Sequence, residues 1–219
     1  MIGAASVRDR RPEPVFARAV RSAVGPARTV LALDGTPYAP ADREVLAVGL
    51  DGPLPSADAA VVSLSPGAWP AVQARLAEVR RAVAGPVVVL TIDPERVQDH
   101  WLTEYAPAVS AGWADGYPRL DRLAAALGGT VETTRLPVPF TCVEGFPEAF
   151  YARPERLLDP GTRTADPAWD ALDDLTARRA VTALRTALET GEWDRRYGHL
   201  RRQPTYDGSV VLLRSERPA

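Results

Sequence analysis

Four short apolar runs in this sequence are each followed by side chains that can bind a ligand or move a proton. If the runs are neighbouring parallel strands, their carboxyl ends meet at one edge of a sheet, which is where open α/β sheets bind ligands. These side chains are therefore the first candidates for chemistry. They are Asp34, Thr36 and Tyr38 after the first run, Asp51 after the second, Ser63 and Ser65 at the end of the third, and Asp93 after the fourth.

Asp34 and Asp51 are the candidate catalytic groups, because a carboxylate in a partly buried turn can act as a general base. Asp before Gly is also ordinary turn chemistry, so Asp34-Gly35 has a second interpretation without function. Asp93 is followed by Pro94, and this pair is typical of the start of a helix or turn, because Asp is a preferred N-cap and Pro suits the first helical position. The sequence leaves the role of Asp34 open and favours a structural role for Asp93.

Several aromatic and polar side chains suit the wall of a small-molecule pocket. The aromatic side chains of this set, and that of Trp113, could instead pack in the core. For His100, the alternative is a position on the surface. The other histidine, His199, lies in the arginine-rich segment RRYGHLRR, which is typical of a solvated face. The expected substrate-binding residues are Tyr38, Ser65, His100, Trp101, Tyr105, Phe146 and Tyr151.

Composition excludes several classes of chemistry. All 26 basic residues are arginine, so neither a Schiff-base lysine nor a lysine general base is available. The net charge of -2 provides no basic field for a nucleic acid partner. The single Cys142 and two histidines cannot assemble a Cys/His zinc site, so we expect no metal, and we interpret Cys142 as a packing residue.

The segment 1–16 lacks the apolar stretch of a secretory signal, and no apolar run approaches membrane-spanning length. A lone cysteine cannot form an internal disulfide, which is typical of a reducing compartment. We therefore expect a cytoplasmic protein with a small-molecule ligand and no membrane or nucleic acid partner.

The apolar runs predict four buried strands that are parallel to one another, because they are rich in valine and apolar on both faces. Helical spacing of apolar residues predicts a helix over 13–23 and another over 69–84, the second joining the third and fourth strands. A strand, helix, strand rhythm is the mark of a doubly wound sheet. The four strands are expected at 29–33, 44–49, 59–64 and 86–91.

The second half continues this pattern to the end of the chain. We expect helices over 117–127 and 170–190 and strands over 130–136 and 209–214. The last strand would form a hairpin with the preceding one and add an antiparallel edge. Residues 1–219 are therefore predicted to form a single α/β domain.

Four segments of the sequence resemble small bacterial class I methyltransferases that use S-adenosylmethionine (SAM). LPSADAAVVSLSPGAWPAVQARLAEVRRAV (54–83) is similar to the strand and following helix beside their acidic edge, and PVVVLTIDPERVQDHWLTEYAP (86–107) to the next strand with its Asp-Pro turn and aromatic lid. LPVPFTCVEGFPEAFYARPERLLDP (136–160) and GEWDRRYGHL (191–200) resemble their substrate-side and C-terminal elements. The resemblance implies a Rossmann-like, mostly parallel twisted sheet with flanking helices.

The sequence departs from that family in three places that bind the cofactor. The turn after the first strand has Gly35 alone, where the family has several glycines that admit the cofactor to bare backbone. Gly49 stands where an acidic residue binds the ribose hydroxyls, with Asp51 two positions on. The stretch 50–57 is too short for the helix and strand that frame the adenine, so the fold is expected to be truncated around the second and third strands.

Three functions are compatible with the resemblance and its departures. The first is a SAM-independent enzyme of bacterial secondary metabolism that performs elimination or ring closure, similar to the aziridine-forming, sulfate-eliminating enzymes of azinomycin-type biosynthesis. Asp34 or Asp51 would be its base, Arg119 or Arg153 would hold the leaving anion, and the ligand would lie between the ends of the first and fourth strands and segment 101–105. The second is a SAM-dependent small-molecule methyltransferase. The third is a noncatalytic subunit that stabilises an active homologue. For the assembly, the resemblance is compatible with a homodimer or with a heterodimer with a related methyltransferase-like protein.

Overall fold

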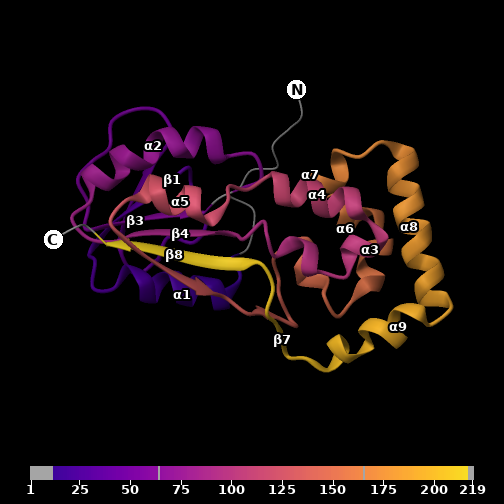
Figure 1. Cartoon of the computed structure of the whole chain (residues 1–219). Coiled ribbons are helices and arrows are strands. Elements are labelled where there is room, and N and C mark those ends of the chain that lie inside the picture. The colour runs from indigo at the N-terminus through magenta and orange to yellow at the C-terminus, as the bar shows by residue number, and fades with distance from the viewer. Residues whose placement is uncertain (1–11, 64, 165, 217–219) are drawn as a thin grey trace.

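The chain folds around one six-stranded sheet (Figure 1). The computed structural model describes residues 12–63, 65–164 and 166–216. The strand order is β2-β1-β3-β4-β8-β5. The bounds are β1 (Thr29–Leu33), β2 (Glu44–Val48), β3 (Ala59–Ser63), β4 (Val87–Ile92), β5 (Thr130–Arg135) and β8 (Val210–Glu216), within two residues of the predicted positions.

The first four strands are parallel, as predicted. β1 pairs with β2 on one side and with β3 on the other, and β3 pairs with β4. All six residues of β4 are buried, as are four of the five in β1 and in β3. Burial on both faces explains why these strands read as continuous apolar runs.

β8 corrects the expectation of an antiparallel edge. It pairs antiparallel with β5, as predicted, but its other side pairs antiparallel with β4, so it lies inside the sheet and β5 forms the edge. The burial of the two strands gives the reason. Val210 to Leu213 are all buried, whereas five of the six residues in β5 are exposed. The apolar strand therefore occupies the interior position, and the polar strand remains outside.

β2 forms the opposite edge, and the predicted truncation is found beside it. Residues 49–58 contain no helix or strand, and only an isolated bridge joins Ala57 to Val83. None of the five residues of β2 is fully buried.

Helices cover both faces of the sheet (Figure 1). α1 (Pro14–Val24) packs on one face, where it contacts β3, β4 and β8. α2 (Trp69–Ala82) and α5 (Leu120–Leu127) lie together on the other face. α5 begins later than predicted, because Pro118 and the extended Arg119 precede it.

A cluster of short helices lies beyond the end of the sheet where β4 finishes (Figure 1). A two-stranded ribbon of β6 (Val138–Pro139) and β7 (Thr205–Tyr206) leads back from this cluster toward β8. Among the described helices, none has the length and apolar character to cross a bilayer. The cluster comprises α3 (Leu102–Tyr105), α4 (Pro107–Asp115), α6 (Pro160–Thr164), α7 (Pro167–Asp170), α8 (Asp174–Glu189), α9 (Glu192–Tyr197) and the 3-10 helices Val97–Asp99, Pro147–Phe150, Pro154–Leu158 and Gly198–Arg202.

The long helix predicted over 170–190 is shorter than expected. Asp173 caps α8, because its carboxylate accepts hydrogen bonds from the backbone N–H groups of Leu175 (3.0 Å) and Thr176 (2.9 Å). Asp170 instead ends the separate helix α7. A capping aspartate in the predicted first turn therefore set the helix start four residues later.

Replacing Leu213 with alanine is expected to lower the free energy of unfolding by about 2–5 kcal/mol, since this side chain is fully buried in the interior strand β8. Val45→Ala on the exposed edge strand β2 is the matched control, with an expected loss below about 1 kcal/mol. Urea denaturation measures both. Equal losses would contradict the interior position of β8.

Candidate functional site

A pocket of about 80 Å³ lies at the carboxyl ends of β1, β3 and β4, where a doubly wound sheet is expected to bind its ligand. Leu90, Thr91 and Ile92 of β4 and Val210 of β8 form part of its lining. Aromatic and polar side chains form most of the rest: Phe16, Tyr38, Trp113, Tyr117, Phe146, Ser63, Ser65 and Glu144.

The five aromatic rings of the lining form one continuous row. Phe16 on α1 contacts Tyr38 (6.5 Å between ring centroids) and Phe146 (6.4 Å). Trp113 on α4 stacks on Phe146 at 6.5 Å with an interplanar angle of 9°, and meets Tyr117 edge-on at 5.3 Å. Segments far apart in the sequence thus supply one aromatic wall.

Tyr38 and Glu144 form a hydrogen-bonded pair in this lining. The Tyr38 hydroxyl donates to Oε2 of Glu144, and its oxygen accepts from the backbone N–H of Glu13 (3.2 Å). Burial, and then the nearby negative charge of Glu144, raise the pKa of Tyr38 well above its usual range. Tyr38 therefore keeps its proton and acts as a donor to the carboxylate.

The buried carboxylate of Glu13 holds the segment that carries Glu144. Its Oε1 accepts from the backbone N–H of Val15 (3.1 Å), which caps α1. Its Oε2 accepts from the backbone N–H of Val143 (3.1 Å). The start of α1, the turn after β1 and the loop at 142–146 are thereby fixed to one another at the pocket.

The two aspartates predicted as bases lie outside this lining. Asp34 is exposed, so the partial burial expected of it is wrong. The reason is the backbone: Asp34 (φ 53°) and Gly35 (φ 66°) are both left-handed, and the turn directs Tyr38 into the pocket instead. Asp51 is likewise exposed, in the loop after β2. The carboxylate that lines the pocket is that of Glu144, which the sequence did not indicate.

Three of the predicted substrate contacts, Tyr38, Ser65 and Phe146, are brought together in the pocket, along with Trp113. The predicted lid at 101–105 is not part of the lining. Trp101 is buried, donates from Nε1 to the carbonyl of Tyr151 (2.9 Å), and meets Trp193 edge-on at 5.5 Å. Tyr105 and Tyr151 are buried as well, so these aromatics pack the helical cluster. Trp113 and Tyr117 contribute aromatic rings to the pocket lining, and segment 101–105 does not.

His100 is a core residue in this structure. Its ring packs against Trp101 (4.9 Å) and Tyr206 (5.6 Å). Nδ1 accepts from the backbone N–H of Leu102 (3.4 Å), and burial lowers the pKa of His100 to about 3. Burial of His100 contradicts the surface alternative, and its imidazole lies outside the pocket lining in which a substrate contact was expected.

The two arginines expected to hold a leaving anion lie apart from the pocket. Arg119 is exposed and pairs with Glu95 and Asp121. Arg153 lies over the rings of Phe140 and Phe150 and lines a second, more polar groove on the other side of the 142–145 loop. Cys142 is buried as expected, and burial raises its pKa to about 12, which makes it a poor nucleophile.

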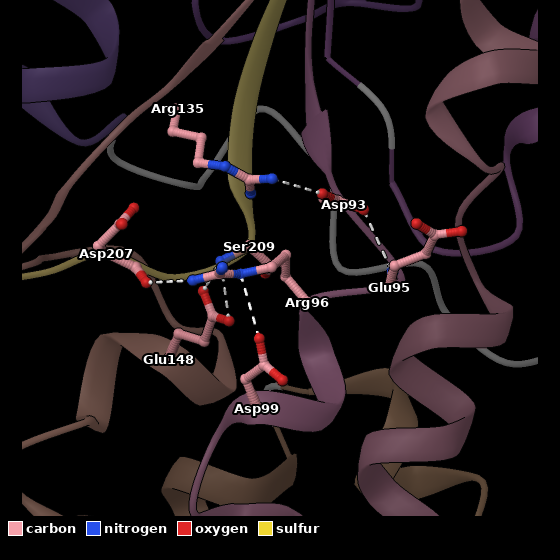
Figure 2. A network of polar contacts seen from close by, with 8 residues as sticks. All are labelled: Asp93, Glu95, Arg96, Asp99, Arg135, Glu148, Asp207 and Ser209. Atoms are coloured by element: carbon pink, nitrogen blue, oxygen red, sulfur yellow. Dashed lines mark hydrogen bonds and ion pairs between the residues drawn. The ribbon is translucent and has the colours of Figure 1, made fainter.

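A network of polar contacts fixes the ends of β4 and β8 beside the pocket (Figure 2). Asp93 accepts from Arg135 (3.2 Å), and its backbone N–H donates to the carbonyl of Ser209 (2.7 Å). Both carboxylate oxygens of Glu148 accept from the backbone N–H of Ser209 (2.9 and 3.0 Å). Arg96 donates to the Asp207 carbonyl at 3.2 Å. Asp93 also accepts from the backbone N–H of Glu95, which stabilises a turn at 94–96. The turn interpretation therefore holds and the helix N-cap does not, because the next helix begins at Val97 with Arg96 as its N-cap.

Glu148 is the buried acid of this network. Its side chain is 1% exposed, and burial, partly offset by the hydrogen bonds from Ser209, raises its pKa to about 7. Gly208 allows this close packing, because an added Cβ would lie 2.7 Å from Cδ of Glu148 and 2.8 Å from Cε1 of Tyr206. Among the described residues, no group of acidic, histidine or cysteine side chains is arranged to hold a metal ion.

Comparison with solved structures shows that a proposed methyltransferase has the same fold. A proposed methyltransferase from an antibiotic biosynthesis pathway of Anabaena variabilis aligns with a TM-score of 0.80 and 19% identity, over 96% of this chain and 99% of that chain. A proposed methyltransferase from Bacillus halodurans aligns with a TM-score of 0.46, 10% identity, and 93% and 99% coverage. The cyclase SpnF aligns with a TM-score of 0.44, 13% identity, and 93% and 81% coverage.

No family model and no curated protein sequence match the chain. The first of these likenesses, at 19% identity, establishes a shared fold over nearly the whole of both chains.

Gly208→Ala is expected to lower the free energy of unfolding by about 1–3 kcal/mol, because the added methyl group would overlap Glu148 and Tyr206. Gly49→Ala is the matched control, since its added Cβ would have nothing nearer than the Asp51 carbonyl oxygen at 3.8 Å. Chemical denaturation compares the two variants. A Gly208→Ala protein as stable as Gly49→Ala would contradict the packing described for Glu148.

Glu148→Gln is expected to flatten the pH dependence of stability. The native pKa of about 7 exceeds the ordinary 4.5, so the native state binds this proton more tightly than the unfolded chain. The associated stability is present in acid and is lost as the pH rises to about 8.

Between about pH 5 and pH 8 the wild-type free energy of unfolding should therefore fall by on the order of 2 kcal/mol more than that of the variant. The exposed Asp99→Asn is the control, and its pH profile should follow the wild type. If the free energy of unfolding of Glu148→Gln has the same pH dependence as that of the wild type, groups other than Glu148 cause this dependence.

Proposed function

We propose that this chain is an enzyme that acts on a small metabolite by acid/base chemistry, either elimination or ring closure, without methyl transfer from SAM. The observation that carries the proposal is the Tyr38–Glu144 pair in the lining of an aromatic pocket at the carboxyl edge of the sheet. A carboxylate beside apolar walls is a general base that the substrate can reach. Formation of an aziridine is one ring closure of this kind.

Glu144 is the base in this proposal. Its carboxylate takes a proton from an N–H or C–H bond of the substrate, and the released electron pair forms the new bond while the leaving group departs with its own pair. Tyr38 holds the carboxylate in place and remains protonated, because burial and the charge of Glu144 both raise its pKa. The aromatic row excludes water and orients the substrate.

The residues at the former cofactor positions do not fit SAM. The exposed Asp34 brings a carboxylate to the turn after β1, where the cofactor's own carboxylate would approach backbone N–H groups. Gly49 has no side chain to accept the ribose hydroxyls after β2. Residues 49–58 supply no helix or strand to cover the adenine. These three features support a function without the cofactor.

Two competing functions lead to different results. A SAM-dependent methyltransferase requires the cofactor to bind despite these features. A noncatalytic partner subunit of an active homologue requires only the fold, and leaves the Tyr38–Glu144 pair without a chemical role.

Calorimetric titration with SAM and with its demethylated product is expected to give no binding at a ligand concentration of about 1 mM, because the ribose acceptor and the glycine turn are absent. The same protein, incubated with a metabolite extract of the host cell, should convert a metabolite to a product of lower or equal mass. Mass spectrometry detects this change.

Glu144→Gln should abolish the conversion, and Asp34→Asn should preserve it within about threefold, because Asp34 lies outside the pocket lining. Micromolar binding of SAM with products heavier by one CH2 unit would replace the proposal with methyl transfer. Identical extracts from wild type and Glu144→Gln would favour the noncatalytic partner.

A further inference from the structure

The pocket that we assign to the substrate has an unusual charge composition. Among the described lining residues, Glu144 has the only carboxyl group, and none has a guanidinium or imidazole group. The negative charge of Glu144 raises the pKa of the adjacent Tyr38. An anionic ligand group inside the pocket would meet this charge, whereas the guanidinium groups of Arg153 and Arg156 line the adjoining groove, which Glu144 also borders.

The aromatic row also favours a positively charged ligand. Ring faces carry partial negative charge, and tryptophan attracts cations most strongly. Trp113 belongs to the row, stacked on Phe146 and edge-on to Tyr117. Aromatic rings grouped around a carboxylate are the usual composition of sites that hold organic cations.

Hydrogen-bonding groups in the same lining favour a ligand with several donors. Oxygen Oγ1 of Thr91 is buried without a hydrogen-bond partner. A buried polar atom in this state costs about 1–3 kcal/mol, which a ligand group that reaches it can recover. The hydroxyls of Ser63 and Ser65 belong to the lining as well. A protonated primary amine has three N–H donors, one for the carboxylate and two for such oxygens.

From these observations we propose that the ligand of this pocket carries a protonated amine, which enters between the aromatic row and Glu144. This inference rests on the proposed function, because it names the substrate class of the same site. The pocket volume of about 80 Å³ admits a group of only a few heavy atoms. The amine end is therefore enclosed, and the remainder of the ligand extends toward the surface.

An amine also suits the chemistry of ring closure. Glu144 takes one N–H proton from the ammonium group, and the nitrogen lone pair becomes available for bonding. That pair forms a bond to a carbon of the same molecule while the leaving group departs with its bonding electrons. A further proton passes from the ring nitrogen to solvent, so the step needs no oxidant or reductant.

Butylammonium, 1-butanol and butyrate are matched probes, because they share an alkyl chain and differ in charge. Titration of the labelled protein at about pH 7 is followed by two NMR signals, the indole N–H of Trp113 and the backbone N–H of Gly145, both from lining residues. The spectrum of Trp113→Phe assigns the indole signal. Butylammonium is expected to bind at least about tenfold more tightly than 1-butanol, and butyrate more weakly than either.

Glu144→Gln keeps the size of the side chain and removes its charge, so butylammonium and 1-butanol should then bind within about twofold of each other. Glu95→Gln is the matched control, since Glu95 is 61% exposed, pairs with Arg119 and lies outside the lining. This variant should retain the wild-type preference. If Glu144→Gln fails to fold, Glu144→Asp, with its carboxylate withdrawn from the pocket, should weaken the preference.

Equal binding of butylammonium and 1-butanol by the wild type, or a preference that survives in Glu144→Gln, would overturn the amine inference. The SAM titration tests the proposed function separately. Binding of SAM with the ammonium preference intact would overturn the SAM-independent function alone, and loss of the preference without SAM binding would overturn the amine inference alone.

Discussion

The site depends on a single buried carboxylate, that of Glu13. One oxygen caps α1 and the other holds the loop at Val143, while the backbone N–H of Glu13 bonds the hydroxyl of Tyr38. A buried carboxylate is costly unless its oxygens are hydrogen-bonded, and here both oxygens have backbone donors. The start of α1, the turn after β1 and the loop at 142–146 are therefore held in the arrangement that satisfies both oxygens. In this arrangement Glu144 lies beside Tyr38.

The topology explains why a site forms at this place. The parallel strands β1, β3 and β4 end at the same edge, and their polar or flexible continuations gather there. β8 runs in the opposite direction between β4 and β5, so its beginning lies at that edge as well. Asp93, Glu148 and Ser209 tie the end of β4 to the beginning of β8 (Figure 2). The pocket floor is therefore held by the sheet and by a buried polar network.

The same features support the proposed function without SAM. In place of the glycine-rich turn, the chain has a turn that directs Tyr38 into the pocket. The loop from β2 to β3 has no covering helix, while the helical cluster at the other side retains a full aromatic core. The helical cluster beyond the end of β4 is thus more complete than the part of the fold around β2. This imbalance is the physical basis for the proposed SAM-independent chemistry.

The sequence by itself determined the six sheet strands, the parallel direction of the first four and the absence of an element after β2. Valine-rich runs buried on both faces and a loop too short for a crossover leave little freedom on these points. The sequence also indicated Tyr38, Ser65 and Phe146 as residues of a ligand pocket, because they follow strands or belong to an aromatic segment. The tertiary structure decided the rest. Exposure of Asp34 follows from left-handed backbone, burial of His100 from packing against Trp101 and Tyr206, and the position of Glu144 from a hydrogen bond across 106 residues of chain. No local sequence pattern predicts such long-range contacts. By sequence alone, Glu144-Gly145 is an ordinary polar turn, and only its contacts with Tyr38 and Glu13 determine its position.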